Sequence, residues 1–388
     1  MTEHEWRKYF AKIVAPEVFP HQPCGNFSGA VVIPVLGENS TFPAVYEHLL
    51  AADNFAEILL LLVINDYPDT PETHRLSNQK LLADLKNGRY PQAYWLECTG
   101  GKLSPPGVGS ARKIGMDAAA GIIASAATGK ERILFCLDGD TWVDKNYFSA
   151  VLQAYQTDRN CPVFIAKFHH RADSAELATA VKSYEEYIYQ WRNGLHYAGS
   201  PYDYVAMGST ITVRVESYLK AGGMRCNSGG EDFYFLQAVR KQGKIKELAD
   251  VTVYPAARHS DRVPFGTGQR LRQIMAAGGM DLTPPWAFEA LKQVLEPVNN
   301  AADIADFLTL PAYYAGHLPP RSWQFFTERN FAANWRKICT NTPHDLPHLQ
   351  AAFITWFDAF KTLKFIHFIL AEQDHGFGGD TFTPAGKA

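Results

Sequence analysis

The sequence is poor in the features that mark secreted, membrane-spanning or zinc-stapled proteins. Its six cysteines include no CxxC pair, which argues against a zinc module or a disulfide framework. The first residues, "MTEHEWRKYFAKIVAPEVFPHQP", lack the apolar stretch of a signal peptide. The longest apolar run, Ile58 to Ile64, is too short to cross a bilayer. We therefore expect a reduced, cytoplasmic protein with no transmembrane segment.

The chain also lacks a charge excess of either sign. Its 37 Lys and Arg against 40 Asp and Glu give a formal net charge of -3, with no basic stripe or RNA-binding signature. Nucleic acid and anionic membrane surfaces are therefore not expected as main partners. A length of 388 residues, 46% of them hydrophobic, fits one large globular domain with an appendage, or two domains.

What the sequence does contain is an alternation of apolar runs and helical patterns. Strands are predicted at Gly29–Leu36 and Ala56–Asp66, separated by a helix at Phe42–Ala52. A third strand is expected at Ala93–Thr99, and a helix at 111–129 leads to a fourth strand at 132–138. Such alternation predicts an α/β fold with a central, mostly parallel sheet flanked by helices.

The sheet pattern fades after about residue 280. "LTPPW" (Leu282 to Trp286) breaks the chain, and helical spacing follows. The last helical pattern, Leu349 to Gln373, is apolar around much of its circumference, so it is expected to pack on the main domain or on a second subunit in a homodimer. The predicted organisation is an N-terminal extension (1–27), a main domain (28–280) and a helical C-terminal extension (281–388).

Two carboxylates, Asp138 and Asp140, follow the fourth strand with only Gly139 between them. Like charges at this spacing repel, so either water solvates them in an ordinary turn or a cation holds them. Their hard oxygen atoms suit Mg²⁺ or Mn²⁺. Because ligands bind at the carboxyl ends of strands in open α/β sheets, the position favours a site.

Two other segments carry charges that could serve such a site. "PPGVGSARKIGMD" places Arg112 and Lys113 near a helix start, where they face an anion or are simply solvated. Glu231 and Asp232 follow two glycines at another helix start, where one carboxylate is explained as a cap. The second carboxylate suggests a place where a substrate comes close.

These segments together resemble the family 2 glycosyltransferases, which have the GT-A fold and use nucleotide-sugars. The resemblance covers about residues 28–280 and depends on the order of "VVIPVLGE", "LLVIND", "GVGSARKIGMD", "FCLDGD" and "MGSTITVR…GGM…GGEDFYFLQAVRKQG". It implies that Asp138 and Asp140 form the DxD motif, and that Glu231 and Asp232 form the ED motif. The residues that it implies for donor binding are Pro34, Glu38, Asn65, Asp66, Arg112, Asp138, Gly208, Ser209 and Arg262.

The activity implied by the resemblance is transfer of a hexosyl group from a UDP- or GDP-sugar to an acceptor hydroxyl, with inversion. Asp232 would be the catalytic base and Glu231 would orient it or bind the acceptor. A metal ion, Mn²⁺ or Mg²⁺, would be bound by Asp138, Asp140 and His259, which follows the final strand, predicted at Asp250–Pro255. Arg262, in the loop after His259, would lie near the diphosphate.

Some residues depart from the family pattern, and two other readings stay open. The first strand has Leu36 and Gly37 where Tyr-Asn is usual, and the second ends in Asn65 instead of Asp, which leaves the nucleotide undecided. "FCLDGDTWV" also resembles the haloacid-dehalogenase phosphatases, although Trp142 stands where they carry Thr or Val. A sugar nucleotidyltransferase is disfavoured, because its glycine-rich Gly-x-Gly-Thr-Arg loop after the first strand is absent. The second open reading is a non-catalytic nucleotide- or carbohydrate-binding protein on a degenerate GT-A fold.

The aromatic stretch from Ser183 to Tyr204 admits two roles. It could offer a stacking surface to an acceptor sugar. For Tyr184, Tyr187 and Trp191, packing into the core is the expected role.

Overall fold

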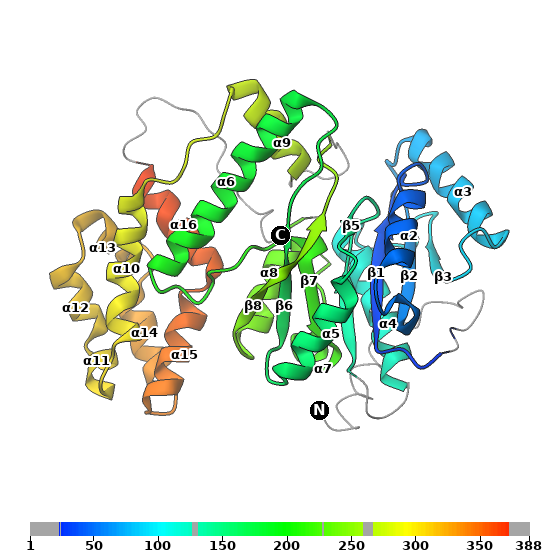
Figure 1. Cartoon of the computed structure of the whole chain (residues 1–388). Coiled ribbons are helices and arrows are strands. Elements are labelled where there is room, and N and C mark those ends of the chain that lie inside the picture. The colour runs from blue at the N-terminus through cyan, green and yellow to red at the C-terminus, as the bar shows by residue number, and fades with distance from the viewer. Residues whose placement is uncertain (1–22, 24, 126–130, 227–228, 259–266, 372–388) are drawn as a thin grey trace. The chain divides into compact units, whose positions relative to one another are not determined.

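The computed structural model describes residues 23, 25–125, 131–226, 229–258 and 267–371 (Figure 1). The chain divides into two compact units. Unit 1 comprises Met1–Glu185 and Ala206–Gly279, and unit 2 comprises Glu186–Val205 and Met280–Ala388. The domain boundaries expected from the sequence stay a prediction.

Unit 1 is built on an eight-stranded sheet in the order β3-β2-β1-β4-β7-β6-β8-β5. Strands β7 and β5 run against their neighbours, and the other six share one direction. The strands are β1 (Gly29–Val35), β2 (Ile58–Asn65), β3 (Ala93–Cys98), β4 (Ile133–Cys136), β5 (Trp142–Val143), β6 (Val163–Phe168), β7 (Ile211–Arg214) and β8 (Ile245–Tyr254).

The central strands are apolar because both of their faces are covered. Every residue of β2 is buried, and it pairs in parallel with β1 from Gly29↔Ile58 to Val35↔Ile64. On β4, the Phe135 ring lies 5.1 Å from that of Phe148, whereas the next residue, Cys136, contacts Met116. Because successive side chains of a strand point to opposite faces, these two contacts belong to two helical layers.

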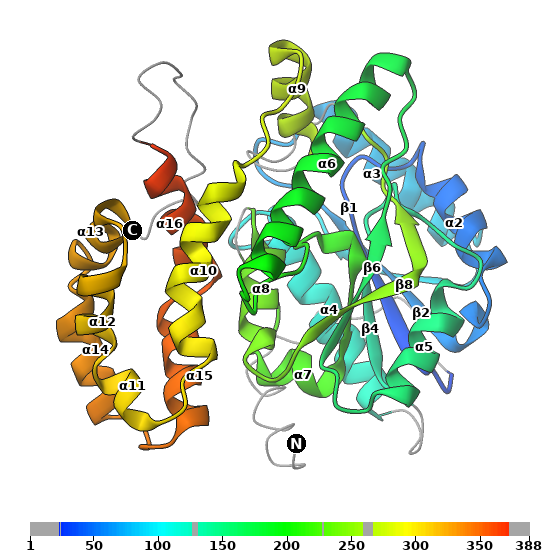
Figure 2. The same ribbon diagram turned by 60° about the vertical axis from the view of Figure 1, so that its left-hand side comes forward.

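The first layer includes α2 (Phe42–Ala51) and α5 (Tyr147–Thr157), and the second includes α4 (Val108–Ser125), α7 (Val215–Lys220) and α8 (Glu231–Arg240) (Figure 2). Helix α4 packs very closely on the sheet, because a Cβ at Gly115 would lie 2.5 Å from Val32 and 2.6 Å from Val63. The other helices of this part of the chain are η1 (Phe55–Glu57), α3 (Glu72–Lys86), α6 (Ala175–Tyr197), η2 (Gly208–Thr210) and α9 (Thr267–Ala277).

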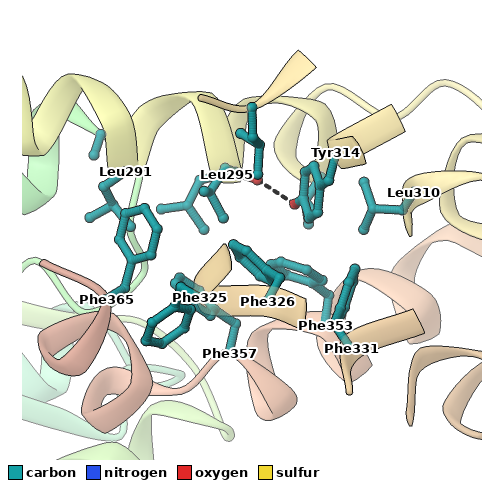
Figure 3. Packing of buried hydrophobic residues seen from close by; sticks show 14 of the residues in the cluster. Leu291, Leu295, Leu310, Tyr314, Phe325, Phe326, Phe331, Phe353, Phe357 and Phe365 are labelled. Carbon is teal, nitrogen blue, oxygen red and sulfur yellow. Dashed lines mark hydrogen bonds between the residues drawn. The ribbon is translucent and has the colours of Figure 1, made fainter. Parts of the chain in front are cut away.

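Unit 2 consists of the last residues of α6 and a set of helices around an aromatic core (Figure 3). Tyr314 donates its hydroxyl to the Val294 carbonyl (2.5 Å), and Trp335 donates Nε1 to the Phe307 carbonyl (2.7 Å). The buried polar ends of these large side chains are thereby satisfied. The helices are α10 (Pro285–Asn299), α11 (Ile304–Leu308), α12 (Leu310–His317), α13 (Pro320–Thr327), α14 (Phe331–Thr340), α15 (Leu346–Trp356) and α16 (Ala359–Leu370).

The predicted α/β fold, with a mostly parallel sheet flanked by helices and a helical C-terminal region, is confirmed. One detail of the helical region was wrong, because the single pattern from Leu349 onward forms two helices, α15 and α16. Asp358 caps the start of the second helix by accepting a hydrogen bond from the Lys361 amide (2.8 Å). A new helix therefore begins there, although the apolar spacing of the sequence continues without a break. Within the described residues, no helix has the length and apolar character needed to span a bilayer.

Candidate functional site

Most of the predicted site residues lie at one edge of the sheet in unit 1. The parallel strands β1, β2 and β4 end at this edge, which brings together Asn65, the last residue of β2, and Glu38 and Asp138, in the loops after β1 and β4. Pro34 lies in β1 itself, opposite Val63 of β2. Strand β7 is antiparallel to β4 and therefore begins where β4 ends. This brings η2, which contains Gly208 and Ser209, to the same edge.

Arg112 connects three of the segments at this edge. Its buried guanidinium forms ion pairs with Asp138, after β4, and with Glu231, at the start of α8. A Cβ at Gly208 would lie 2.0 Å from Arg112 Nη1, so only a glycine leaves room for the guanidinium there. Burial lowers the pKa of Arg112, but the charges of Asp138 and Glu231 outweigh it and raise the pKa above its ordinary value.

A second arginine, Arg258, bridges Glu38 and Asp140. Its Nη2 lies 2.5 Å from Glu38 Oε1 and 2.5 Å from Asp140 Oδ2, and its Nη1 lies 3.0 Å from Glu38 Oε2. The Thr41 hydroxyl lies 2.7 Å from Glu38 Oε2 and 3.2 Å from the Gly139 carbonyl oxygen, which joins the loops after β1 and β4. The two aspartates of the DxD segment are therefore each bound by a guanidinium, Asp138 by Arg112 and Asp140 by Arg258.

Glu231 and Asp232 begin α8, after Gly230 in the left-handed conformation (φ +71°). Burial raises the pKa of Glu231 to about 7; Arg112 opposes this shift, and the charge of Asp232 adds to it. Burial also raises the pKa of Asp232, whose Oδ1 accepts a hydrogen bond from the Phe233 amide (2.7 Å). Both adjacent carboxyls therefore hold a proton more readily than an exposed carboxyl does, which suits groups that take part in proton transfer.

Asn65 and Asp66 are engaged by the protein itself. Asn65 donates Nδ2 to the carbonyls of Val35 (3.0 Å) and Val63 (3.1 Å). Asp66 accepts a hydrogen bond from the Gly100 amide (2.8 Å) at Oδ1. Both side chains therefore hold the loops after β1, β2 and β3 in place. The Asn65 amide donors are used within the fold, so Oδ1 is the Asn65 atom left to meet a ligand donor.

Several buried polar atoms in the segments that meet at this edge have no hydrogen-bond partner within the described part of the chain. They are Arg112 Nε, Ser110 Oγ, Ser209 Oγ and Asn65 Oδ1. Ser110 lies two residues before Arg112, on the first turn of α4. Ser209 follows Gly208, the glycine next to the Arg112 guanidinium. Buried polar groups are nearly always hydrogen-bonded, so this group of atoms favours a polar ligand at this edge.

The residues present fit a divalent cation in donor type. Asp138 offers a carboxylate that is 39% exposed, while Asp140 is buried and bound by Arg258. Hard carboxylate oxygens suit Mg²⁺ or Mn²⁺. Among the described residues, no three Asp, Glu, His or Cys side chains converge as a ready metal group. The predicted third ligand, His259, and the predicted donor-binding Arg262 lie outside the described residues.

Three further residues contact or face the site, and none of them is among the residues predicted from the sequence. Arg258 has a signal in the sequence, because it is a basic residue four positions after the end of β8. Arg171 donates Nη2 to the Asp140 carbonyl (2.5 Å) and lies 3.5 Å from the centroid of the Trp142 ring. Tyr67 has its pKa raised to about 12 by burial and by the charges of Glu231 and Asp66. No sequence motif marks Arg171 or Tyr67.

Comparison with known proteins gives a structural likeness and no family. No protein-family model matches the chain, and no curated protein matches it. The similar solved structures include S. aureus TarS 1-349 in complex with UDP-GlcNAc (12% identity, TM-score 0.43) and in complex with UDP (13%, 0.42); each match covers 79% of this chain and 89% of that one. A longer TarS structure has 13% identity and a TM-score of 0.40, covering 84% of this chain and 54% of its own. At TM-scores below 0.5, the likeness does not assign this chain to a family.

Proposed function

We propose that the carboxyl edge of the unit 1 sheet is the active site of a nucleotide-sugar-dependent glycosyltransferase with the GT-A fold. The reaction would transfer a hexosyl group to an acceptor hydroxyl with inversion. The donor would be a UDP- or GDP-sugar, and the acceptor would be a compound with a free hydroxyl group.

One observation carries this proposal. Four carboxylates from three separate segments of the sequence meet two arginines at one sheet edge, with unpartnered polar atoms beside them. A diphosphate needs hydrogen-bond donors and positive charge, and an acceptor hydroxyl needs a base. Arg112, Ser110 and Ser209 supply the donors, and Asp232 supplies the base.

Each residue has a role that follows from its contacts. Arg112 would stabilise the negative charge that builds on the leaving diphosphate, because its position is fixed by Asp138 and Glu231. Asp232 would accept the proton of the attacking hydroxyl, and its raised pKa suits that task. Glu231 would hold Arg112 in place and orient the base.

A divalent cation, Mn²⁺ or Mg²⁺, would be held by Asp138 and Asp140, with His259 as the third protein ligand. When bound, it would supply positive charge to the diphosphate. Arg262 would lie beside the same group. The pocket for the nucleotide-sugar would be shaped by Pro34, Glu38, Asn65, Asp66 and Gly208. Asn65 Oδ1 would accept a hydrogen bond from the nucleobase.

The test is donor binding and turnover with matched variants. Melting temperatures are measured with UDP-glucose, UDP-GlcNAc and GDP-mannose, each in MnCl₂ and in EDTA, because a bound donor raises the melting temperature by mass action. We expect one donor to stabilise the protein in Mn²⁺. Asp138→Asn and Asp140→Asn should each remove this effect. Asp84→Asn, which changes a carboxylate paired with Arg89 on the surface, is the matched control and should keep it.

Several results would contradict the proposal. If no donor stabilises the protein under either condition, a transferase site is wrong. Phosphate release from p-nitrophenyl phosphate without any nucleotide-sugar would identify a phosphatase instead. Binding of a donor without turnover of any donor would identify a non-catalytic binding protein. For an active enzyme, the anomeric configuration of the product, read by NMR, decides between inversion and retention.

A further inference from the structure

Unit 2 contains a pocket of about 730 Å³ between the last turns of α6 and the first turns of α10. This volume lies within the range of pockets that hold small ligands, roughly 300–1,000 Å³. One wall is a stripe along α6 with helical spacing: Glu186, Tyr189, Asn193 and Tyr197. The other wall is the start of α10, where Trp286 and Glu289 lie.

The floor of the pocket is rigid. A Cβ at Gly194 would lie 2.4 Å from the Phe288 ring, so α10 approaches α6 closely at this glycine. Phe288 is buried, and its ring packs edge-on against Trp191, with 5.7 Å between centroids. Gln190 donates Nε2 to the Thr283 carbonyl (2.6 Å), which ties the chain before α10 to α6. Trp191, for which core packing was expected, is partly buried and packs against the core of unit 2.

The walls of the pocket, by contrast, are exposed aromatic rings. Tyr197 is 54% exposed and Trp286 is 40% exposed. Lys292 Nζ lies 4.7 Å from the Tyr197 ring centroid, and the Tyr197 hydroxyl donates to Glu289 (2.5 Å). Large exposed rings in a concave place are unusual for a surface without a ligand, because apolar area in water costs free energy.

The polar groups at the pocket narrow the class of ligand. Glu186 and Glu289 are carboxylates with several lone pairs, and Asn193 carries an exposed amide. Two carboxylates repel an anionic ligand, so a phosphate or nucleotide is disfavoured. A neutral ligand with one apolar face for stacking and several hydroxyl donors fits both the rings and the acceptors. A sugar ring has both of these properties.

We propose that this pocket binds a neutral saccharide, with Trp286 as the stacking surface and Glu186, Asn193 and Glu289 as hydroxyl partners. The preference for a sugar over other neutral ligands rests on the proposed transferase function, for which the bound saccharide would be part of the acceptor. The pocket is built entirely from unit 2 residues, so its occupancy can be measured without any nucleotide-sugar.

The experiment uses the full chain and four probes: maltotetraose, cellotetraose, mannotetraose and chitotetraose. Binding is followed by saturation-transfer NMR, and affinities by calorimetry. We expect at least one probe to bind, and Trp286→Ala and Asn193→Ala each to weaken it, Trp286→Ala by about tenfold. Both side chains are exposed, so neither variant threatens folding. Tyr313→Ala, which removes a ring that is 41% exposed elsewhere in unit 2, is the matched control and should leave the affinity unchanged.

Three outcomes would overturn the inference. The first is that no tetrasaccharide binds. The second is that a tetrasaccharide binds with an affinity that neither Trp286→Ala nor Asn193→Ala changes. The third is that tetramethylammonium binds and is weakened equally by Trp286→Ala, which would make the pocket a cation site. The proposed function fails separately, in the donor-binding test. Binding of a tetrasaccharide without binding of any nucleotide-sugar would support the saccharide pocket and refute the transferase function. Binding of a nucleotide-sugar without binding of any tetrasaccharide would support the transferase function and refute the saccharide pocket.

Discussion

Arg112 should be the residue on which unit 1 depends most strongly for electrostatic balance. It is buried and forms ion pairs with both Asp138 and Glu231. Arg112→Met keeps much of the side-chain volume but leaves Glu231 buried without a counter-charge. Removing one partner of a buried ion pair typically costs about 3–5 kcal/mol. Arg89→Met is the matched control, because Arg89 forms a surface pair with Asp84 that is worth about 0–1 kcal/mol.

The loss caused by Arg112→Met should depend on pH with a definite sign. Burial raises the pKa of Glu231 to about 7 in the native protein, so this group favours folding below its unfolded pKa and loses that contribution as pH rises towards 7. Without Arg112, the pKa of Glu231 moves higher still. Below pH 7, Glu231 is protonated in both proteins and adds little to their difference. Above pH 7, the difference grows by about 1.4 kcal/mol per pH unit until Glu231 ionises in the variant.

Native-state hydrogen exchange of the β4 amides measures this effect within unit 1 alone. Opening free energies, corrected for intrinsic exchange rates, are compared at pH 6 and pH 8.5. The double variant Arg112→Met/Glu231→Gln should recover part of the loss at pH 8.5, because it removes the unpaired charge. A loss of equal size at both pH values, with no recovery in the double variant, would refute the assignment of Glu231 as the buried partner.

Three further predictions follow from single contacts. Asp232→Asn should lower turnover by about 10²–10⁴-fold with little change in donor affinity, since a base acts on the chemical step; joint loss of both would make Asp232 a binding or structural group. Gly208→Ala should destabilise the β4 region by about 1–3 kcal/mol, because its Cβ would lie 2.0 Å from Arg112; Gly279→Ala, where a Cβ meets no atom within 4 Å, is the control, and equal effects would contradict the packing argument. Phe326→Ala should cost unit 2 about 3–5 kcal/mol by opening its aromatic core, measured by exchange of the α13 and α14 amides; a loss below about 1 kcal/mol would mean that the core repacks.

The sequence predicted the first half of the sheet well because of how those strands are buried. The runs Gly29–Leu36 and Ala56–Asp66 correspond to β1 and β2 within two residues, since strands covered on both faces are continuously apolar. The helix predicted from Ala111 begins earlier, at Val108. The final strand was expected to begin at Asp250 but begins at Ile245, because none of its first six residues is fully buried and they form no apolar run.

The site could be predicted in location but not in its contacts. Strand ends are visible in a sequence, so the edge that carries Glu38 and Asp138 was foreseen. Which side chain neutralises each aspartate was not visible, because Arg258 lies far along the chain from Glu38 and Asp140. The same holds for Asn65, which was assigned to the donor; its amide hydrogens are bonded to the backbone of β1 and β2.

The charge balance of this edge bears directly on the cation proposed for it. Glu38, Asp138, Asp140, Glu231 and Asp232 are five carboxylates, and the described arginines that contact them or their backbone are Arg112, Arg171 and Arg258. Even with Glu231 and Asp232 both protonated, three carboxylates face three guanidinium groups, so these arginines carry no surplus positive charge for a diphosphate. Like charges this close cost free energy in a partly buried site. The donor therefore needs additional positive charge, and a divalent cation at the exposed edge of Asp138, together with Arg262, would provide it. Donor affinity should therefore be higher in MnCl₂ than in EDTA. An equal affinity in the two conditions would mean that the arginines alone balance the charge of the diphosphate.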